Sequence, residues 1–396
     1  MSIQNLYDLA VKAIDDNERE LFQINQQIHQ NPELAYTEFK AHDLLTNYLE
    51  KQGFQVDRSY SLPTAFRAVF PCGKGPKICV ICEYDALPSI GHACGHNLIA
   101  EAGIAAAIGI KAAMESSDND LGQLVVYGTP AEEDDVGKIK MIEAGCFNDI
   151  DIAMMVHPCP FDAGYANWPA ALSLSITYEG KSAHAAGSPW EGVNALDAAV
   201  QAYVNISTLR QQFKPTWRVH GIILEGGIRT NIIPAKTSLE YRARAPNDKE
   251  LKILRQKCED CFLSAAQATG CKVEITDRND YYAAVNNNLQ LVDLYEKHAT
   301  SFGINFMSRA EQKQMTVGST DMGNVSQVVP SIHPLFAIDS SDANHTITFT
   351  EAASTEQSHR QTLIAAKSMA MTCIEVLSNP DLQVQIKEEF LRSQNH

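Results

Sequence analysis

Hydrophobic positions along the first 160 residues alternate between strand-like and helix-like patterns. Residues 77–83 form a short apolar run rich in β-branched side chains, which predicts a buried strand. Residues 97–114 are rich in alanine, isoleucine and glycine and predict a packed helix. Further strands are expected at 65–70, 123–128 and 152–156, and helices at 3–30, 37–52 and 137–144. Strands that alternate with helices in this way predict a mostly parallel sheet, with reactive loops along one edge.

The pattern changes near Trp168. Residues 172–178 place leucine and isoleucine against serine and threonine, as in a strand with one exposed face. Helices at 194–211 and 248–269, with strands at 220–225, 238–243 and 271–276, complete the order of a ferredoxin-like domain. We therefore expect a catalytic domain from residues 1–169 and 284–396, with an inserted α+β domain at 170–283. After a long helix at 351–377, the polar residues beyond Pro380 are expected to form a surface tail.

Composition narrows the class of protein. With 396 residues, of which 45% are hydrophobic and 20% charged, the chain is expected to be soluble and globular with two domains. A formal net charge of -16 argues against nucleic acid and anionic membrane surfaces as partners. Neither a secretory signal nor a membrane span is expected. The ten cysteines are therefore expected to be free thiols in a reducing compartment, which predicts a cytoplasmic protein.

The segment GHACGHN at 91–97 joins the strand at 77–83 to the helix at 97–114. Its Cys94 and His96 lie two residues apart in the predicted loop, and a thiolate with an imidazole suits zinc. The N–H groups that open the following helix would favour the thiolate form of Cys94. A buried cysteine beside a helix-capping loop is an equally good interpretation of this segment alone.

Four more candidate donors follow predicted strands or lie in loops: Glu132, Glu133, His157 and His345. A pair of bridged metal ions needs about five protein donors of this kind. If the backbone turns between Glu132 and Glu133, one carboxylate can bind metal while the other takes a proton from the attacking water. Taken alone, two consecutive acids also suit a solvated helix start, and each histidine suits an ordinary turn or strand end.

Eight segments in one order give a more specific indication: IHQNPEL (28–34), YDALP (84–88), GHACGHN (91–97), GTPAEE (128–133), KMIEAG (140–145), GKSAHAA (180–186), TNIIPAK (230–236) and GSTDMGNVS (318–326). With them the chain resembles the co-catalytic zinc aminoacylase/carboxypeptidase family of metallopeptidases. It looks closest to the amidohydrolase branch, with auxin-conjugate hydrolases, aminobenzoyl-glutamate hydrolase, and β-alanyl-lysine or Xaa-Arg type dipeptidases. The resemblance implies a zinc-exopeptidase-like catalytic domain and an inserted dimerisation and lid domain.

The resemblance also implies roles for individual residues. It makes Glu132 the general base, Asp85 the acid that orients a metal ligand, and His184 a histidine that stabilises the oxyanion across a dimer. Asn231, Gly318 and one of Arg242 and Arg244 would bind the substrate, and the two arginines are expected to face opposite sides of a strand. The metal ligands would be Cys94, His96, Glu133, His157 and His345.

The function implied is metal-dependent hydrolysis of the amide bond of dipeptides with a basic C-terminal residue. Two alternatives stay open: an amidohydrolase of N-acyl or aminobenzoyl amino acids, and a non-catalytic ligand-binding member of the fold. The cofactors would be two divalent ions, zinc first, with manganese or cobalt as alternatives, and the protein would be a homodimer. Asp134 and Asp135 stand where many relatives carry glycines, so they could shift the pKa of the base, attract a cationic substrate or point to solvent.

Overall fold

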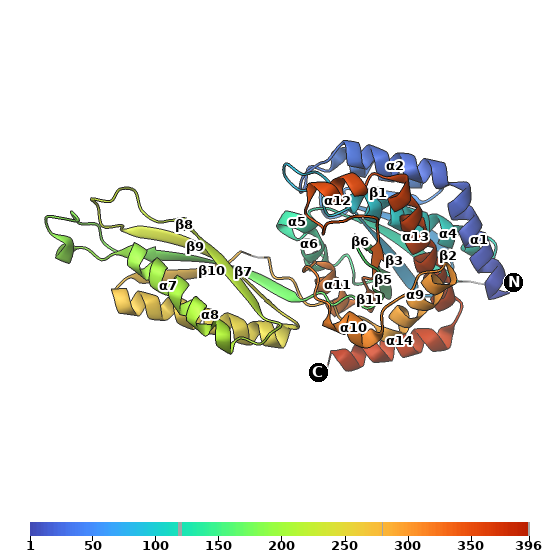
Figure 1. Ribbon diagram of the computed structural model, residues 1–396. Helices are drawn as coiled ribbons and strands as arrows, with labels where there is room; N and C mark the ends of the chain where they lie inside the picture. Colours follow the sequence, from blue (N-terminus) through green and yellow to red (C-terminus); the bar gives the residue numbers. More distant parts are fainter. Residues whose placement is uncertain (118–120, 279, 395–396) are drawn as a thin grey trace. The chain divides into compact units, whose positions relative to one another are not determined.

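A computed structural model of the protein describes residues 1–117, 121–278 and 280–394, which form two compact units (Figure 1). The first unit consists of Met1–Asn167, Val285–Val317 and Asp321–His396. The second unit consists of Trp168–Ala284 and Gly318–Thr320. The second unit is thus an insertion into the chain of the first, and each unit encloses its own hydrophobic core.

The first unit is built on strands β1 (Gln55–Arg58), β2 (Phe66–Cys72), β3 (Lys77–Glu83), β4 (Gly122–Thr129), β5 (Ile152–Met154), β6 (His157–Cys159), β11 (Ser331–Ile332) and β12 (Leu335–Ala337). Six of them form one sheet in the order β1-β2-β4-β3-β5-β11, and β12 pairs with β6. The pairs β4/β3, β3/β5, β5/β11 and β12/β6 are parallel, whereas β1/β2 and β2/β4 are antiparallel. The mostly parallel sheet predicted from the sequence is confirmed.

Helices surround this sheet: α1 (Ile3–Asp16), α2 (Glu18–Gln30), α3 (Phe39–Lys51), α4 (His96–Glu115), α5 (Glu132–Asp135), α6 (Gly137–Glu143), α9 (Leu289–Ser301), α10 (Arg309–Gln314), α11 (Met322–Val328), α12 (Ile347–Ala352), α13 (Glu356–Leu377) and α14 (Pro380–Ser393). The helix expected at 3–30 is interrupted at Asn17, so it forms α1 and α2. The surface tail expected beyond Pro380 is wrong, because these residues form α14. Asn379 caps that helix, and Leu382 and Ile386, one turn apart, are buried in the main core.

Strand β3 is buried on both faces. Ile78 and Val80 belong to the core cluster that includes α4 and α13, whereas Cys79 and Ile81 belong to a cluster that includes α6 and α11. A strand covered on both sides has no polar face, which explains the continuous apolar run in its sequence.

Cys79 and the other eight cysteines whose side chains the structure describes are free thiols, as expected.

Helix α4 packs closely against β3. A Cβ atom at Gly103 would lie 2.4 Å from the Cys82 Sγ atom, so glycine is required for this approach. By length and composition α4 could cross a membrane, yet 89% of its apolar window is buried inside the protein, as in a core helix. Since α4 begins at His96, this tight packing fixes the position of the loop that carries Cys94.

The second unit contains β7 (Ala170–Glu179), α7 (Ala195–Leu209), β8 (Arg218–Glu225), β9 (Lys236–Ala245), α8 (Asp248–Thr269) and β10 (Lys272–Asp277). Its strands form an antiparallel sheet in the order β10-β7-β9-β8. Helices α7 and α8 pack together over this sheet (Figure 1). The expected ferredoxin-like arrangement is confirmed.

Strand β8 is an edge of this sheet, and large apolar side chains are exposed on it. Ile222 and Leu224 are each 58% exposed, and Val200 and Val204 on α7 are 47% and 51% exposed. An exposed apolar edge strand is a site at which another chain can add.

Candidate metal centre

The loop after β3 and the start of α4 place Cys94 and His96 next to each other. Gly95, between them, has a φ of 81°, and a Cβ atom there would lie 2.5 Å from Pro158. Cys94 lies in the loop as expected, whereas His96 is already the first residue of α4. Both side chains are buried, so they can bind an ion away from bulk water.

Asp85 fixes two candidate ligands at once. Its Oδ1 atom lies 3.0 Å from His96 Nδ1, and its Oδ2 atom accepts a 3.0 Å hydrogen bond from the backbone N–H of Glu133. With Nδ1 engaged, His96 is left with Nε2 as the atom that can face a metal ion. These two contacts are the ones that an orienting role of Asp85 requires.

The consecutive carboxylates Glu132 and Glu133 lie on the one-turn helix α5. Ala131 and Val136, on either side of this helix, have φ angles of 60° and 49°, so the chain turns sharply before and after it. The donor atoms of Glu132, Glu133 and His96 all lie within 4.8 Å of one another. Because consecutive residues of a helix lie about 100° apart around its axis, the two carboxylates leave the backbone in different directions.

His157 and His345 come from distant parts of the chain. His157 Nδ1 lies 2.8 Å from the Pro158 carbonyl oxygen, so the ring donates there, and its Nε2 atom lies 3.4 Å from Cys94 Sγ. His345 Nε2 lies 3.4 Å from Glu133 Oε1. Two further groups of donors, each within 4.8 Å, are Cys94, His96 and His157, and Cys94, Glu133 and His345. All five predicted ligands thus lie around one site.

Unsatisfied buried atoms show that this site fits metal ions. His96 Nε2 and Glu133 Oε1 are buried, have no hydrogen-bond partner among the described residues, and lie 3.8 Å apart. A buried polar atom without a partner costs about 1–3 kcal/mol. Metal–donor bonds of about 2.0–2.2 Å place two donors of one ion within about 4.4 Å, so a shared cation would satisfy both atoms.

Burial and crowded carboxylates govern protonation at the site. The pKa of Glu132 lies well above its ordinary value, chiefly because the side chain is buried and also because the acids Glu83 and Glu133 lie nearby. The pKa of His157 is lowered to about 3, chiefly because the ring is buried and also because His96 lies nearby, and the imidazole is therefore neutral. The pKa of Cys94 is raised, chiefly because the thiol is buried and also because Glu133 lies nearby, and both effects oppose the thiolate form. A bound cation would reverse this balance for the thiol and the carboxylates.

The other predicted site residues lie in the second unit. His184 is exposed, and its Nδ1 atom accepts hydrogen bonds from the backbone N–H groups of Ala186 (3.2 Å) and Gly187 (3.0 Å). Its Nε2 atom therefore carries the ring proton and can donate to an oxyanion. Asn231 and Gly318 are exposed residues outside the helices and strands of this unit.

The expectation that Arg242 and Arg244 face opposite sides is wrong. Residues two apart in a strand share a face, and in β9 both arginines alternate with buried residues. Arg242 lies 3.7 Å from Asp280 and over the Tyr282 ring. Arg244 Nη1 lies 3.1 Å from His220 Nε2.

Three buried charged residues beside the site were missed: Glu83 at the end of β3, Lys138 on α6 and Asp321 at the start of α11. Asp321 lies within the GSTD segment already noted, and Glu83 is two residues before Asp85. Lys138 follows a glycine in a short helix and has the sequence context of a surface residue. The available signal was Glu83 itself, a charged residue that ends the otherwise apolar strand β3.

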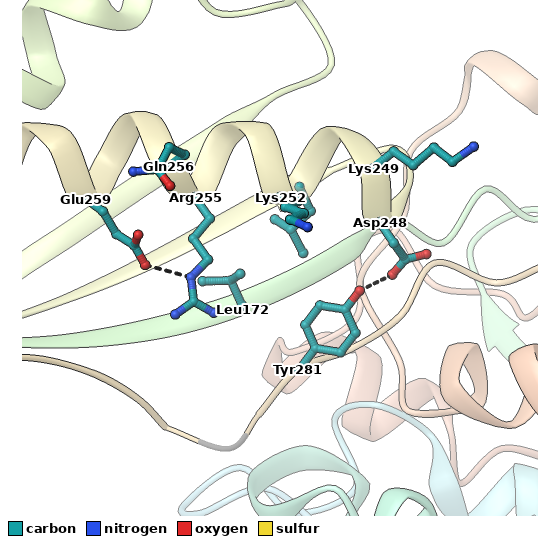
Figure 2. Close-up of a pocket in the computed structure, with 9 residues that line it drawn as sticks. Leu172, Asp248, Lys249, Lys252, Arg255, Gln256, Glu259 and Tyr281 are labelled. Atoms are coloured by element: carbon teal, nitrogen blue, oxygen red, sulfur yellow. Dashed lines mark hydrogen bonds and ion pairs between the residues drawn. The ribbon is translucent and has the colours of Figure 1, made fainter.

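A pocket of 550 Å³ in the second unit contains none of the predicted site residues (Figure 2). Two pairs of its polar groups bond each other: Arg255 with Glu259 at 2.7 Å, and the Tyr281 hydroxyl with Asp248. The pocket contains none of the candidate metal donors.

The sequence of the chain is similar to those of known peptidases. The sequence pattern of the peptidase dimerisation domain matches residues 170–269. The chain is 47% identical to the mouse (Mus musculus) Xaa-Arg dipeptidase and 46% identical to the human (Homo sapiens) one, in each case over 96% of this chain and 91% of the relative. It is 29% identical to a component of the p-aminobenzoyl-glutamate hydrolase of Escherichia coli, over 98% of this chain and 95% of the relative.

Solved structures share the fold. A dinuclear metal-binding peptidase of the M20 family from Bacillus subtilis aligns with a TM-score of 0.73 at 19% identity, over 92% of this chain and 99% of that one. An aminobenzoyl-glutamate utilization protein from Klebsiella pneumoniae aligns with a TM-score of 0.67 at 17% identity, over 92% and 97% of the two chains.

Proposed function

Because the chain belongs to the M20 family of metallopeptidases, which are amide-bond hydrolases, we propose that it cleaves dipeptides whose C-terminal residue is basic. The observation that carries the proposal is the convergence of five candidate metal donors on one site, with Glu132 next to two of them, His96 and Glu133. The identity to the two Xaa-Arg dipeptidases, nearly half of all positions over nearly the whole chain, supports the substrate class.

Each part of the site has a task in the proposed reaction. Two divalent ions, when bound, would polarise the scissile carbonyl and acidify the attacking water. Glu132 takes the proton from that water and gives it to the departing amine. Asp85 keeps His96 and Glu133 in position, and the Nε2–H of His184 stabilises the oxyanion.

The proposed ions are zinc, with manganese or cobalt as alternatives. Cys94 and His157, 3.4 Å apart, provide sulfur and nitrogen donors of the kind that zinc prefers. Elemental analysis of protein purified without added metal would identify the native ion.

Arg244 is the better candidate for binding the substrate carboxylate. Arg242 already has an acidic neighbour in Asp280, whereas Arg244 has no acidic partner among the described residues. A half-buried guanidinium without a counter-ion is a ready partner for a carboxylate. Arg244→Lys should therefore raise KM for dipeptides more than Arg242→Lys does.

We also propose that the protein is a homodimer. The match of residues 170–269 to a peptidase dimerisation domain supports this, as do the exposed apolar residues on β8 and α7. Light scattering on the purified protein would give the mass. A monomer at micromolar concentration would contradict the proposal.

The experiment that tests the function is a substrate panel with purified protein. We expect Xaa-Arg and Xaa-Lys dipeptides to be cleaved faster than Xaa-Ala dipeptides, and a chelator to abolish cleavage. Turnover restricted to N-acyl or p-aminobenzoyl amino acids would favour the amidohydrolase alternative. Protein that binds metal and cleaves no member of the panel would be a ligand-binding member of the family.

A further inference from the structure

Behind the metal centre lies a buried ion triad formed by Glu83, Lys138 and Asp321. Their side chains are at most 1% exposed. Lys138 Nζ donates to Glu83 Oε1 and, at 2.8 Å, to Asp321 Oδ1, while the backbone N–H of Lys138 donates to Asp321 Oδ2 at 2.9 Å. Burying three charges is costly unless each is paired and hydrogen-bonded, so every atom in the triad should have a partner.

One atom of the triad has none. Glu83 Oε2 is buried and has no hydrogen-bond partner among the described residues. It lies 3.6 Å from His96 Nε2, the ring atom that Asp85 leaves unoccupied. Glu133 Oε1, which also has no hydrogen-bond partner among the described residues, lies 3.8 Å from the same nitrogen. Both oxygens therefore lie next to one unsatisfied nitrogen.

We infer that Glu83 is a further metal donor, which uses Oε2 for the ion bound by His96 while Lys138 holds Oε1. This inference rests on the proposed metal centre. The distance of 3.6 Å lies within the span of about 4.4 Å that two metal–donor bonds allow. Lys138 supplies a positive charge next to Glu83 that offsets the additional carboxylate at the site.

The additional oxygen changes which ions suit the site. Cys94 and His157 favour zinc, whereas carboxylate oxygens and higher coordination numbers suit manganese. With Glu83 included, the ion at His96 gains an oxygen donor. The loss of Glu83 should therefore weaken manganese binding more than zinc binding.

Asp321 provides a matched control. It carries the same charge as Glu83, is equally buried and binds the same lysine, but both of its oxygens are already engaged by Lys138. If Glu83 only balanced the charge of Lys138, then Glu83→Gln and Asp321→Asn should change metal binding alike. A donor role predicts that only Glu83→Gln does so.

The test uses full-length apoprotein of the wild type, Glu83→Gln and Asp321→Asn, titrated with Mn²⁺ and with Zn²⁺. We expect Glu83→Gln to bind at least one Mn²⁺ at least ten times more weakly, with a smaller loss for Zn²⁺. Its Co²⁺-loaded form should absorb visible light more strongly than wild type, because lower coordination numbers give more intense bands. Asp321→Asn should match wild type in both measurements.

Equal effects of the two substitutions, or no effect of Glu83→Gln, would overturn the donor role and leave the proposed function intact. Wild-type protein that binds no divalent ion would overturn both. Should Glu83→Gln fail to fold, a crystal structure of Mn²⁺-loaded wild type decides the question. Glu83 Oε2 bonded to the ion supports the inference, and Oε2 out of bonding distance refutes it.

Discussion

The carboxylate of Asp85 holds the His96 ring with one oxygen and, with the other, the backbone of the adjacent candidate ligand Glu133, each at 3.0 Å. Asp85→Asn keeps the size of the side chain but leaves a single acceptor oxygen for these two contacts. We expect metal affinity to fall about 10- to 100-fold, as for other orienting carboxylates. Competition with a chromogenic chelator would measure it.

Asp162→Asn is the control for this change. Asp162 is another partly buried acid of the same unit, and it accepts a 2.9 Å hydrogen bond from the backbone of Ala337. Metal affinity should be unchanged in this variant. Equal losses in both variants would mean that Asp85 acts only on overall stability.

Glu132→Gln tests the proton transfer. The amide occupies the same space as the carboxylate but cannot accept a proton, so we expect kcat to fall by about 10²- to 10⁴-fold. Metal content should stay at the wild-type level, because five other donors remain. Near-normal turnover would remove Glu132 from the role of base.

The acids that follow the base give a test of specificity. Asp135 is paired with Lys140 at 2.6 Å. Asp134 is exposed, and its pKa is raised first by partial burial and then by the acids Glu133, Asp85 and Asp135. If Asp134 meets the basic side chain of the substrate, then Asp134→Asn should lower kcat/KM for Xaa-Arg by about fivefold, an energy near 1 kcal/mol. Xaa-Ala and the Asp135→Asn variant serve as controls, and a uniform loss would argue for a general effect.

His184→Ala should reduce kcat by about 10²- to 10³-fold, since it removes one oxyanion donor. Mixing this variant with Glu132→Gln tests whether the histidine acts across a dimer. A dimer with one chain of each kind can contain one intact site, so up to about a quarter of wild-type activity should return. Activity that stays at the sum of the two variants would argue against action across the dimer.

Glu38 should make stability depend on pH. It accepts hydrogen bonds from Thr64 Oγ1 (2.7 Å) and the backbone of Ala131 (3.0 Å), and burial raises its pKa from 4.5 to about 7. Below pH 4.5 the group is neutral in both folded and unfolded protein. Between pH 4.5 and 7 only the unfolded form ionises, so stability is lost as pH rises, and the loss is complete above pH 7.

Glu38→Gln cannot ionise and should escape this loss. Between pH 5 and pH 8, the difference in unfolding free energy between the variant and wild type should shift in favour of the variant by up to about 3 kcal/mol. Denaturant unfolding at the two pH values measures the difference. A gap between the two proteins that does not change with pH would mean that Glu38 keeps its ordinary pKa.

The sequence was informative where strands end in unusual residues. Cys94, Glu133 and His157 follow buried strands of one sheet, and parallel strands bring their ends together. His345 was a weaker candidate from its position alone, because its segment follows the short strand β12 at a distance. Lys138 and Glu83 were missed because a single charged residue gives no periodic signal in the sequence. The ion pair between them joins residues that are far apart in the chain, so it can be seen only in the structure.

The order of the chain also has a consequence for synthesis on the ribosome. The second unit comes almost entirely from residues 168–284, so its sheet can form while the rest of the protein is still being made. In the first unit, β5 can pair with β11, and Lys138 with Asp321, only after these later residues have been made. The last candidate donor is residue 345. A nascent chain therefore carries only four of the five candidate donors until residue 345 has been added.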